Sequence, residues 1–489
     1  MGKGEKYDVV IIGAGIGGLV CGCYLAKAGL KVLIVEKNDK PGGYCSSFER
    51  DGYRFDVGLH YLGGIKNGIL GKILEELDLK DRMRFYRIDP TDKIIIGDNV
   101  TYIRTNPYDT IREFKNTFPK EKAQIDKFFR FIMNENFLEV YKKTKRVSFR
   151  CILDEFFELK ETQNFFEALI FGILGLKASE ISALTTVVLF RQHILDPGYY
   201  PIGGAQSFVD GLIKLIREFK GEFLFSTEVS EIIIKKRKAK GVIFRDGRKV
   251  ISKYVISNID AKMTFKNLIK IKSKEAIKIN KLLLSPSPFA VYIGGESSAT
   301  AKQVGAKSGW YFSCNFSHHS KEDIVRGKEI KWLTWTFSSF AKDKNLKNNK
   351  KLSIGIFTGV HPTSKVFWKE YRDNFGKQII KKIKNFIPQI RNIRLTLTAP
   401  PTTFYKYTFN RKGAAFGWAS TPKQISISTF PFTTSIKGLF LVGQWVTIGT
   451  GQAGIPTVAL TGRRVSKFII ERFEENKAKK SLFKKRLLP

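Results

Sequence analysis

Acidic residues are scarce in this chain of 489 residues, where 45 Asp and Glu stand against 84 Lys and Arg, a formal net charge of +39. Such an excess favours polyanionic partners, either nucleic acid or acidic lipid headgroups. Lysine, isoleucine, phenylalanine and asparagine are all abundant, as AT-rich coding produces, and that bias explains the excess equally well. The charge alone identifies no partner. Because no basic–aromatic motif of a known module is present, nucleic-acid binding is not expected.

Cysteine and histidine are also rare. An odd cysteine number without a disulfide framework fits a reducing compartment, and we expect core thiols at Cys21, Cys23, Cys45, Cys151 and Cys314. The first two are separated by one residue, which is poor spacing for a metal. His318, His319 and His361 have no acidic or cysteine partners at metal spacing. No metal site is therefore predicted.

Only one uncharged run approaches membrane-spanning length, VVIIGAGIGGLVCGCYLA at residues 9–26. Four glycines fall within six of its residues, and neither a basic leader nor an A-x-A cleavage site frames it. The sequence therefore predicts neither a signal peptide nor a transmembrane helix. We expect a cytoplasmic protein, and peripheral contact with the inner face of the membrane stays open.

That same run has the pattern of a dinucleotide-binding unit. YDVVII is a buried strand, GAGIGG is a tight turn, LVCGCYLAKAG has helical spacing and KVLIVEK is a second strand. In this pattern Gly13 makes the sharp turn, Gly15 lets a pyrophosphate approach the backbone, and Gly18 permits close packing of helix on strand. The pyrophosphate then lies at the helix N-terminus. Glu36 ends the second strand, where its carboxylate accepts from ribose hydroxyls.

A second glycine pair, Gly42–Gly43, follows the second strand, and Asp51–Gly52 marks a type I′ hairpin. This order resembles the FAD-binding flavoproteins that include amine oxidases and carotenoid desaturases. Many of those relatives have an arginine after the glycine pair, whereas this chain has Tyr44. With a tyrosine in place of that arginine, the chain is more similar to the branch of carotenoid isomerases and retinol saturases. The string GLHYLG is most similar to the saturase version.

Two distant segments extend the resemblance over essentially the whole chain. The segment from Tyr199 resembles the re-entry into the flavin domain, with a three-stranded meander in which Val229 corresponds to a residue that contacts adenine. Near the C-terminus, LFLVG is a buried strand, and Pro456 suits the first turn of a helix aimed at the flavin pyrimidine carbonyl. Gln444 replaces an acidic residue that holds the ribityl chain in many relatives.

The resemblance implies an α/β fold, a discontinuous Rossmann-type FAD-binding domain with an inserted mixed α+β substrate domain. The FAD-binding domain is expected at residues 1–75, 199–265 and 430–475, the substrate domain with its helical insert at 76–198 and 266–429, and a basic tail at 476–489. The expected FAD-binding residues are Gly13, Gly15, Gly17, Gly18, Glu36, Lys37, Gly42, Gly43, Tyr44, Ser47, Leu59, Val229, Gly443, Gln444, Gly454, Ile455 and Pro456.

The activity implied is FAD-dependent oxidoreduction of a hydrophobic polyene isoprenoid, a carotenoid or retinoid, by hydride exchange at flavin N5. Desaturation, saturation and cis–trans isomerisation all stay open, as does the electron donor or acceptor. His60 and Tyr61, in FDVGLHYLGG, are the catalytic candidates, either protonating a carbanion-like centre or forming the wall beside the flavin. The alternatives are a flavin amine oxidase-like enzyme and a non-enzymatic prenyl- or lipid-binding protein of the same fold, like the Rab GDP-dissociation inhibitors.

The inserted regions carry less information. Residues 76–198 are expected to be helical, and residues 165–190 are apolar almost all round, so that they are either fully buried or lining an apolar tunnel or a membrane contact. FAVYIGG, KWLTWTFSSF and LSIGIFTGV are expected strands, with a lysine-rich loop from residue 341 between two of them. The tail from Lys477 mixes six basic residues with Leu and Phe, and we expect it to be flexible, either solvated or resting on acidic lipid.

Overall fold

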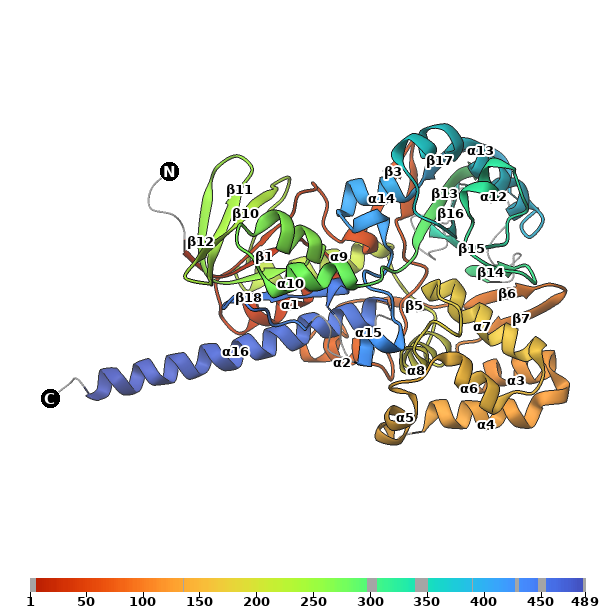
Figure 1. Cartoon of the computed structure of the whole chain (residues 1–489), viewed down its shortest axis with the longest axis horizontal. Helices are drawn as coiled ribbons and strands as arrows, with labels where there is room; N and C mark the ends of the chain where they lie inside the picture. The colour runs from red at the N-terminus through yellow and green to blue at the C-terminus, as the bar shows by residue number, and fades with distance from the viewer. Residues whose placement is uncertain are drawn as a thin grey trace.

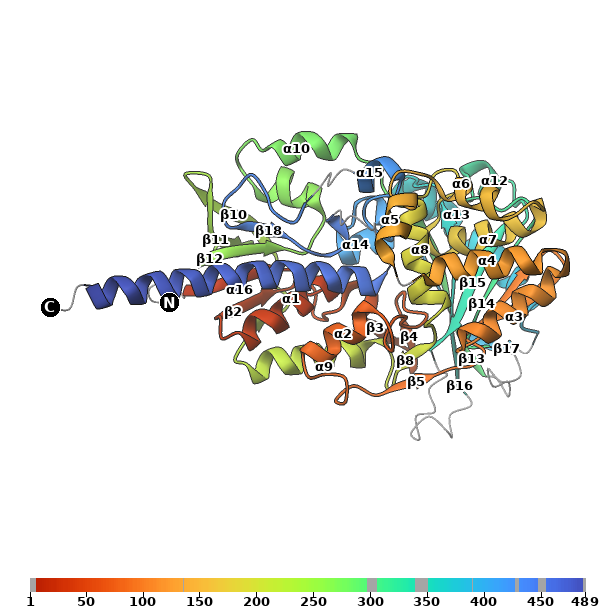
Figure 2. The same ribbon diagram turned by 90° about the horizontal axis from the view of Figure 1, so that it is seen from below.

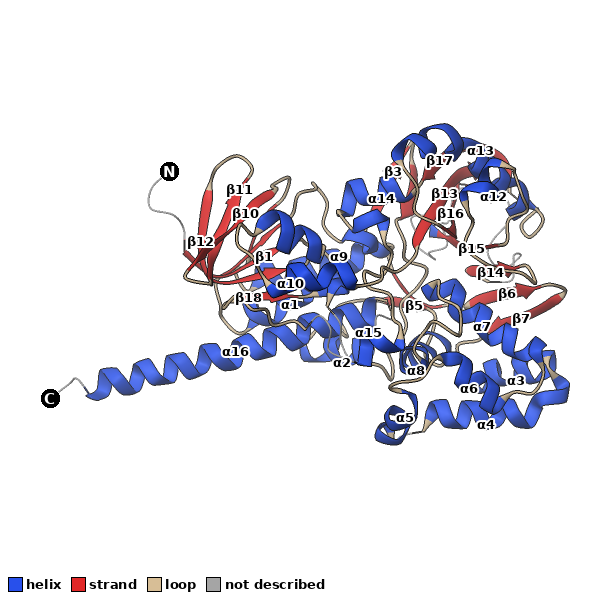
Figure 3. Cartoon of the chain, in the orientation of Figure 1, coloured by secondary structure: helices blue, strands red, loops and turns tan. Residues whose placement is uncertain are grey.

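The computed structural model describes residues 6–134, 136–296, 306–338, 351–388, 390–426, 431–446 and 454–486. The lysine-rich loop expected from residue 341 lies outside these ranges up to residue 350. Two seven-stranded sheets organise the chain, one at each end of the molecule (Figure 1). The mixed helix-and-strand architecture confirms the predicted α/β class (Figure 3).

The first sheet joins strands from three distant parts of the chain. Its strand order is β10-β11-β12-β1-β2-β9, and β18 pairs with β12. Strands β1, β2, β9, β12 and β18 run parallel, whereas β10, β11 and β12 form the predicted antiparallel meander. The strands are β1 (Lys6–Ile12), β2 (Val32–Val35), β9 (Glu222–Leu224), β10 (Val229–Lys235), β11 (Lys238–Phe244), β12 (Lys249–Ser257) and β18 (Leu439–Leu441).

Strand β1 is buried on both faces because its alternate residues enter two different cores. Val9 and Ile11 pack against helices α1 (Ile16–Lys27), α9 (Ala205–Glu218) and α16 (Ile455–Arg486). Val10 and Ile12 face the core under the meander. Such two-sided burial explains the continuous apolar run, which is typical of a central parallel strand. Beside this sheet lies a π-helical turn at Met263–Leu268, followed by α10 (Lys274–Lys278).

A short hairpin, β3 (Ser47–Arg50) with β4 (Tyr53–Asp56), leads from the first sheet toward the second. The first sheet with its covering helices is here called the first domain, and the second sheet with its helices the second domain. Asp51 and Gly52 both have positive φ, 52° and 73°, as the predicted type I′ turn requires.

The second sheet has the order β17-β13-β16-β15-β14-β6-β7 and is antiparallel except where β14 meets β6. The three expected strands, FAVYIGG, KWLTWTFSSF and LSIGIFTGV, correspond to β13, β15 and β16, and the last two residues of the second lie outside the described ranges. The strands are β6 (Asp92–Ile96), β7 (Asn99–Ile103), β13 (Ser287–Glu296), β14 (Ser308–Phe312), β15 (Trp332–Phe337), β16 (Lys351–Val360) and β17 (Arg391–Ala399). Helices α12 (Lys321–Val325) and α13 (Lys365–Lys384) cover it, and α14 (Pro401–Thr408) and α15 (Pro422–Ser426) lead back to the first domain.

The expectation that residues 76–198 are helical is wrong for residues 85–103. That stretch forms β5 (Phe85–Arg87), which pairs with β8 (Tyr199–Pro201), and then the hairpin of β6 and β7. Isoleucine, valine and threonine around a turn at Gly97 favour a strand pair. Helix α2 (Ile69–Glu76) precedes this region, whose α-helices are α3 (Pro107–Thr117), α4 (Lys122–Met133), α5 (Phe137–Thr144), α6 (Phe149–Phe156), α7 (Lys160–Leu174) and α8 (Ala183–Leu189).

Helix α16 continues to Arg486 and projects beyond the body of the molecule in both ribbon views (Figures 1 and 2). The tail expected from Lys477 has a helical backbone up to Arg486, and its flexibility stays a prediction. Lysine, alanine and leucine are good helix formers, and neither glycine nor proline interrupts them before Pro489. Among the helices of the described ranges, none is both long enough and apolar enough to cross a membrane.

Candidate cofactor and substrate site

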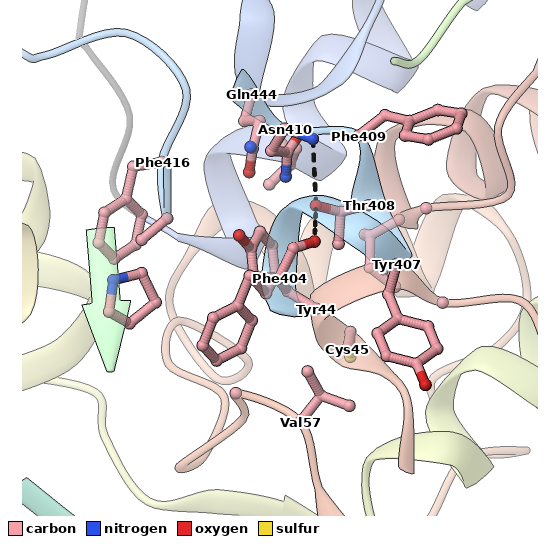
Figure 4. A pocket seen from close by; sticks show the side chains of 18 of the residues that line it. Tyr44, Cys45, Val57, Phe404, Tyr407, Thr408, Phe409, Asn410, Phe416 and Gln444 are labelled. Atoms are coloured by element: carbon pink, nitrogen blue, oxygen red, sulfur yellow. Dashed lines mark hydrogen bonds between the residues drawn. The ribbon is translucent and has the colours of Figure 1, made fainter. Parts of the chain in front are cut away.

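A cavity of about 540 Å³, here called the central cavity, is lined by residues of both domains. One part of it, the glycine end, lies along the turn after β1 and the glycine pair after β2. The other part, the aromatic end, is lined from the second domain by Trp310, Trp332, Phe357 and Phe416. Figure 4 shows Tyr44, Phe404, Phe416 and Gln444 around this space.

The glycine turn after β1 has the geometry that a diphosphate needs. Gly13 has a φ of 94°, the left-handed region that favours glycine. Gly15 occupies the N-cap of α1, and no side chain caps this helix end. A Cβ on Gly18 would lie 2.5 Å from the carbonyl oxygen of Gly13, so only glycine allows α1 to lie this close to the turn. The helix N-terminus is thus open to an anion.

Glu36 lines the glycine end, where the sequence predicts it, and it also braces the turn. Its Oε2 accepts from the backbone N–H of Ala14 at 2.9 Å, and its Oε1 accepts from the backbone and side chain of Asn38 at 3.0 and 2.9 Å. Since a carboxylate offers about four acceptor positions, one is left for a ribose hydroxyl. The group therefore combines a structural contact with a binding contact.

The second glycine pair lies beside the first. Gly15 and Gly42 form a parallel bridge, and the amide of Gly42 donates to the carbonyl of Ala14 at 2.8 Å. Gly42 and Gly43 have positive φ of 116° and 59°, which a branched side chain resists. The hydroxyl of the adjoining Tyr44 donates toward the carbonyls of Gly413 and Ala414, each at 3.2 Å.

The remaining predicted cofactor residues separate into two sets. Gly17, Lys37, Leu59, Val229, Gln444, Gly454, Ile455 and Pro456 also line the central cavity. The Lys37 ammonium is turned toward α14, donating to the carbonyl of Lys406 at 2.6 Å and lying 3.5 Å from the ring centroid of Phe409. The Gln444 Nε2 atom is buried with no hydrogen-bond partner among the described residues, as expected of a group reserved for a ligand.

Three predicted cofactor residues do not line the cavity. Gly18 lies behind the turn, as its packing role requires. The Ser47 hydroxyl donates to Asp56 Oδ1 at 2.6 Å within the protein. The Gly443 amide donates to Thr461 Oγ1 at 2.7 Å, and a Cβ on Gly443 would meet Asn258 Oδ1 at 2.4 Å. The contacts of these three residues are within the protein, so their role is to support the residues that line the cavity.

Asn258, immediately after β12, is a site residue that the sequence reasoning missed. Its Nδ2 donates to the carbonyl of Gly13 at 3.1 Å, and its side chain lies within 3 Å of the Cβ positions of Gly15 and Gly17. Its backbone N–H donates to Ile12 at 2.9 Å. The available signal was its position at the carboxyl end of a parallel strand, where ligands bind in open α/β sheets.

His60 and Tyr61 both line the cavity, but neither is arranged as an acid. The His60 ring stacks near Trp310, with centroids 5.6 Å apart, and burial, with a smaller effect of Lys307, lowers its pKa to about 3. The Tyr61 hydroxyl donates to Asp92 Oδ2 at 2.7 Å, and burial followed by Asp92 raises its pKa well above the usual range. His60 is thus neutral at physiological pH, and the hydroxyl proton of Tyr61 is in a hydrogen bond to Asp92.

The apolar segment at residues 165–190 is mainly core. Phe165, Phe166 and Phe171 are almost fully buried in a cluster of phenylalanines. Only the end of α7 and the next residue, at 172–175, line the cavity. Burial is therefore confirmed for most of the segment, and cavity lining for the last turn of α7.

The parallel sheet and the glycine turn define a mixed α/β fold of the Rossmann type. The family model for an NAD(P)-binding Rossmann-like domain matches residues 11–77. Over 94% of its length the chain is 25% identical to an all-trans-retinol 13,14-reductase of Danio rerio, with 85% of that protein covered. It is 29% identical, also over 94%, to prolycopene isomerase 2 of an Oncidium hybrid cultivar, with 83% covered. The chain is a homologue of these enzymes, and the predicted resemblance is confirmed.

Solved structures show the same fold. An oxidoreductase from Methanosarcina mazei has a TM-score of 0.68 at 21% identity, covering 95% of this chain and 100% of that one. A putrescine oxidase variant has a TM-score of 0.66 at 15% identity, covering 95% and 99%. A Rab GDI from Plasmodium falciparum has a TM-score of 0.54 at 14% identity, covering 81% and 89%. At these identities the likeness concerns the fold alone, which all three functional alternatives share.

Proposed function

We propose that the protein is an FAD-dependent oxidoreductase acting on a hydrophobic polyene isoprenoid, a carotenoid or retinoid. The observation that carries this proposal is the continuity of the central cavity, in which a dinucleotide cradle opens into an uncharged aromatic compartment. Its homologues that reduce all-trans-retinol or isomerise prolycopene support the same substrate class.

The residues of the glycine end fit FAD. The open N-terminus of α1 would hold the diphosphate and Glu36 the ribose. The Nε2 atom of Gln444, which has no partner among the described residues, would bind the ribityl chain. The start of α16, at Ile455, would face the flavin pyrimidine carbonyl, as the sequence predicts. When bound, FAD supplies a ring that accepts or donates a hydride at N5 and, once reduced, assists double-bond rearrangement.

The aromatic end determines the substrate class. Among the described residues that line the aromatic end there is no Asp, Glu, Lys or Arg. His318 also lines it, and because burial lowers the pKa of its imidazole, this ring is neutral. An ammonium substrate would enter without a counter-ion and would lose its hydration. A polyene chain has no polar group whose hydration would be lost, and it gains contact with Trp310, Trp332 and Phe357. The compartment therefore disfavours the amine oxidase alternative, and its main contribution is orientation of the substrate over the cofactor.

The test begins with the colour and visible spectrum of the purified protein. We expect oxidised-flavin absorbance. Anaerobic incubation with carotenes and retinol, followed by chromatography, should show a desaturated product with the oxidised flavin, or a saturated or isomerised product after the flavin has first been reduced with dithionite. Turnover of amines with release of hydrogen peroxide would instead favour the amine oxidase alternative. A protein that stays colourless after incubation with FAD would favour the prenyl-binding alternative.

A lipid surface is the expected source of so apolar a substrate, and contact with acidic membranes is part of the proposal. The net charge of +39 supports attraction to anionic headgroups. Co-sedimentation with phosphatidylglycerol vesicles, but not with phosphatidylcholine vesicles, is the expected result.

A further inference from the structure

Lys307 brings a charged group into the interior beside the His60–Tyr61 segment. Its side chain is 1% exposed, just before β14. Its Nζ donates to the backbone carbonyl of His60 at 2.6 Å and to Thr336 Oγ1 at 2.9 Å. It also lies 3.8 Å from the centroid of the Tyr200 ring. Two acceptors and one aromatic face satisfy the ammonium, and one of these acceptors belongs to the main chain of the cavity wall.

The same segment is fixed on both sides of this contact. Before it, Asp56 accepts a hydrogen bond from the Tyr200 hydroxyl, so the Tyr200 ring lies between the lysine and a carboxylate. After it, Tyr61 donates to Asp92, which also accepts from Trp310 Nε1 at 3.0 Å. Trp310 is in turn the residue on which the His60 ring stacks. The position of the His60 ring therefore depends on one connected, buried polar network.

We propose that Lys307 is a positioning residue, whose ammonium group holds the His60 segment so that the imidazole forms the wall of the central cavity. Lys307 itself does not line the cavity, and it acts through the carbonyl that it binds. The role rests on the proposed function, because the wall it positions is the one beside the expected cofactor and substrate.

The charge of this lysine is sensitive to pH near neutrality. Burial lowers the pKa of Lys307 from 10.5 to about 7, and the nearby carboxylates of Asp56 and Asp92 oppose this shift. The neighbouring titratable groups are His60, whose pKa is about 3, and Tyr61 and Tyr200, whose pKa values lie well above 10. Burial raises the pKa of Asp92 from 3.8. The charge-assisted part of the hold on His60 is therefore fully present below the pKa of Lys307 and is lost as the pH rises through it.

The experiment follows the visible flavin spectrum of the intact holoprotein from about pH 6 to about pH 9. In the wild type we expect a transition with a midpoint near 7. K307M has no such transition, whereas K307R keeps the low-pH spectrum throughout because guanidinium stays charged. The exposed Lys270→Met variant is the matched control, since it removes the same charge from the surface and should behave as wild type.

A second variant keeps the proposal testable if K307M or K307R folds poorly. T336V removes one acceptor from the ammonium while keeping the shape of the side chain. Because the charged form loses a hydrogen bond, the midpoint of the transition should move to lower pH. Tryptophan emission of the flavin-free protein gives a readout independent of the cofactor, because Trp310 contacts the His60 ring.

The failures are distinguishable. A protein that binds no flavin overturns the proposed function, but its tryptophan emission still reports the Lys307 transition. A flavin-bound K307M variant that keeps the wild-type transition overturns the positioning role and assigns the titration to another group, such as Asp92. An unchanged midpoint in T336V also contradicts the proposal.

Discussion

Replacing Gly15 by valine is the sharpest test of the dinucleotide site. A Cβ at Gly15 would lie 2.9 Å from Asn258 Nδ2, the atom that holds the carbonyl of Gly13 at 3.1 Å. The amide must move, which loosens the turn, and the two methyl groups of valine obstruct the approach to the N-terminus of α1. Loss of one hydrogen bond to a charged phosphate costs about 1.5–3 kcal/mol. We therefore expect the Kd for FAD to rise roughly 10- to 150-fold.

Titration of the flavin-free protein with FAD, followed by flavin fluorescence or calorimetry, measures this change. Gly29→Asn is the matched control, because it alters the opposite end of α1, where a Cβ meets nothing within 4 Å and asparagine tolerates the φ of 80°. Far-UV circular dichroism establishes that both variants fold. If the folded Gly15→Val variant bound FAD as tightly as the wild type, the phosphate site would lie elsewhere.

Four further results are expected. Glu36→Ala should weaken FAD binding more than Glu36→Gln, measured by the same titration, because the alanine removes both the brace on Ala14 and the ribose acceptor. Tyr61→Phe should lower the free energy of unfolding by about 1.5–3 kcal/mol, as for the loss of a hydrogen bond to a charged partner. Its turnover should stay within roughly tenfold of the wild type, a much smaller loss than removal of a general acid causes. A larger loss of turnover would restore Tyr61 as the acid. Phe166→Ala should cost about 3–5 kcal/mol in urea unfolding without changing flavin affinity, since this fully buried ring does not line the cavity. Burial lowers the pKa of His319 from 6.5 to about 4. As the pH falls, the unfolded state therefore binds the proton first, and the free energy of unfolding should fall by roughly 3 kcal/mol between about pH 6.5 and pH 4. Thermal melts should show a weaker pH dependence in His319→Gln.

The glycine end was predictable because its pattern is local. Gly13, Gly15, Gly18 and Glu36 lie within one strand–turn–helix–strand unit, where spacing in the sequence fixes spacing in space. The Asp51–Gly52 turn was predictable for the same reason, since two residues decide its backbone.

The residues that complete the site were not predictable in this way. Asn258 meets Gly13 across 245 positions of sequence, and Lys307 meets His60 across 247. Nothing next to either residue marks the contact, because it depends on how the sheets are assembled. The strands at residues 92–103 were missed for a different reason. Phenylalanine-rich helices follow them, and the helical pattern of the region outweighed the β-branched residues at its start.

The central place of β1 between β2 and β12 has a consequence for synthesis of the chain. Because β12 also pairs with β18, the parallel core is complete only after Leu441 has been made, roughly 430 residues after Ile12. At the usual rate of translation, about 5–20 residues per second, the sheet waits roughly 20–90 s for its last parallel strand, β18, and β1 itself waits roughly 12–50 s for its second neighbour, β12, which ends at Ser257. The apolar segment VVII is exposed during that interval, so folding on the ribosome should depend on chaperones. A fragment ending before β12 should aggregate, since its central strand has one edge unpaired.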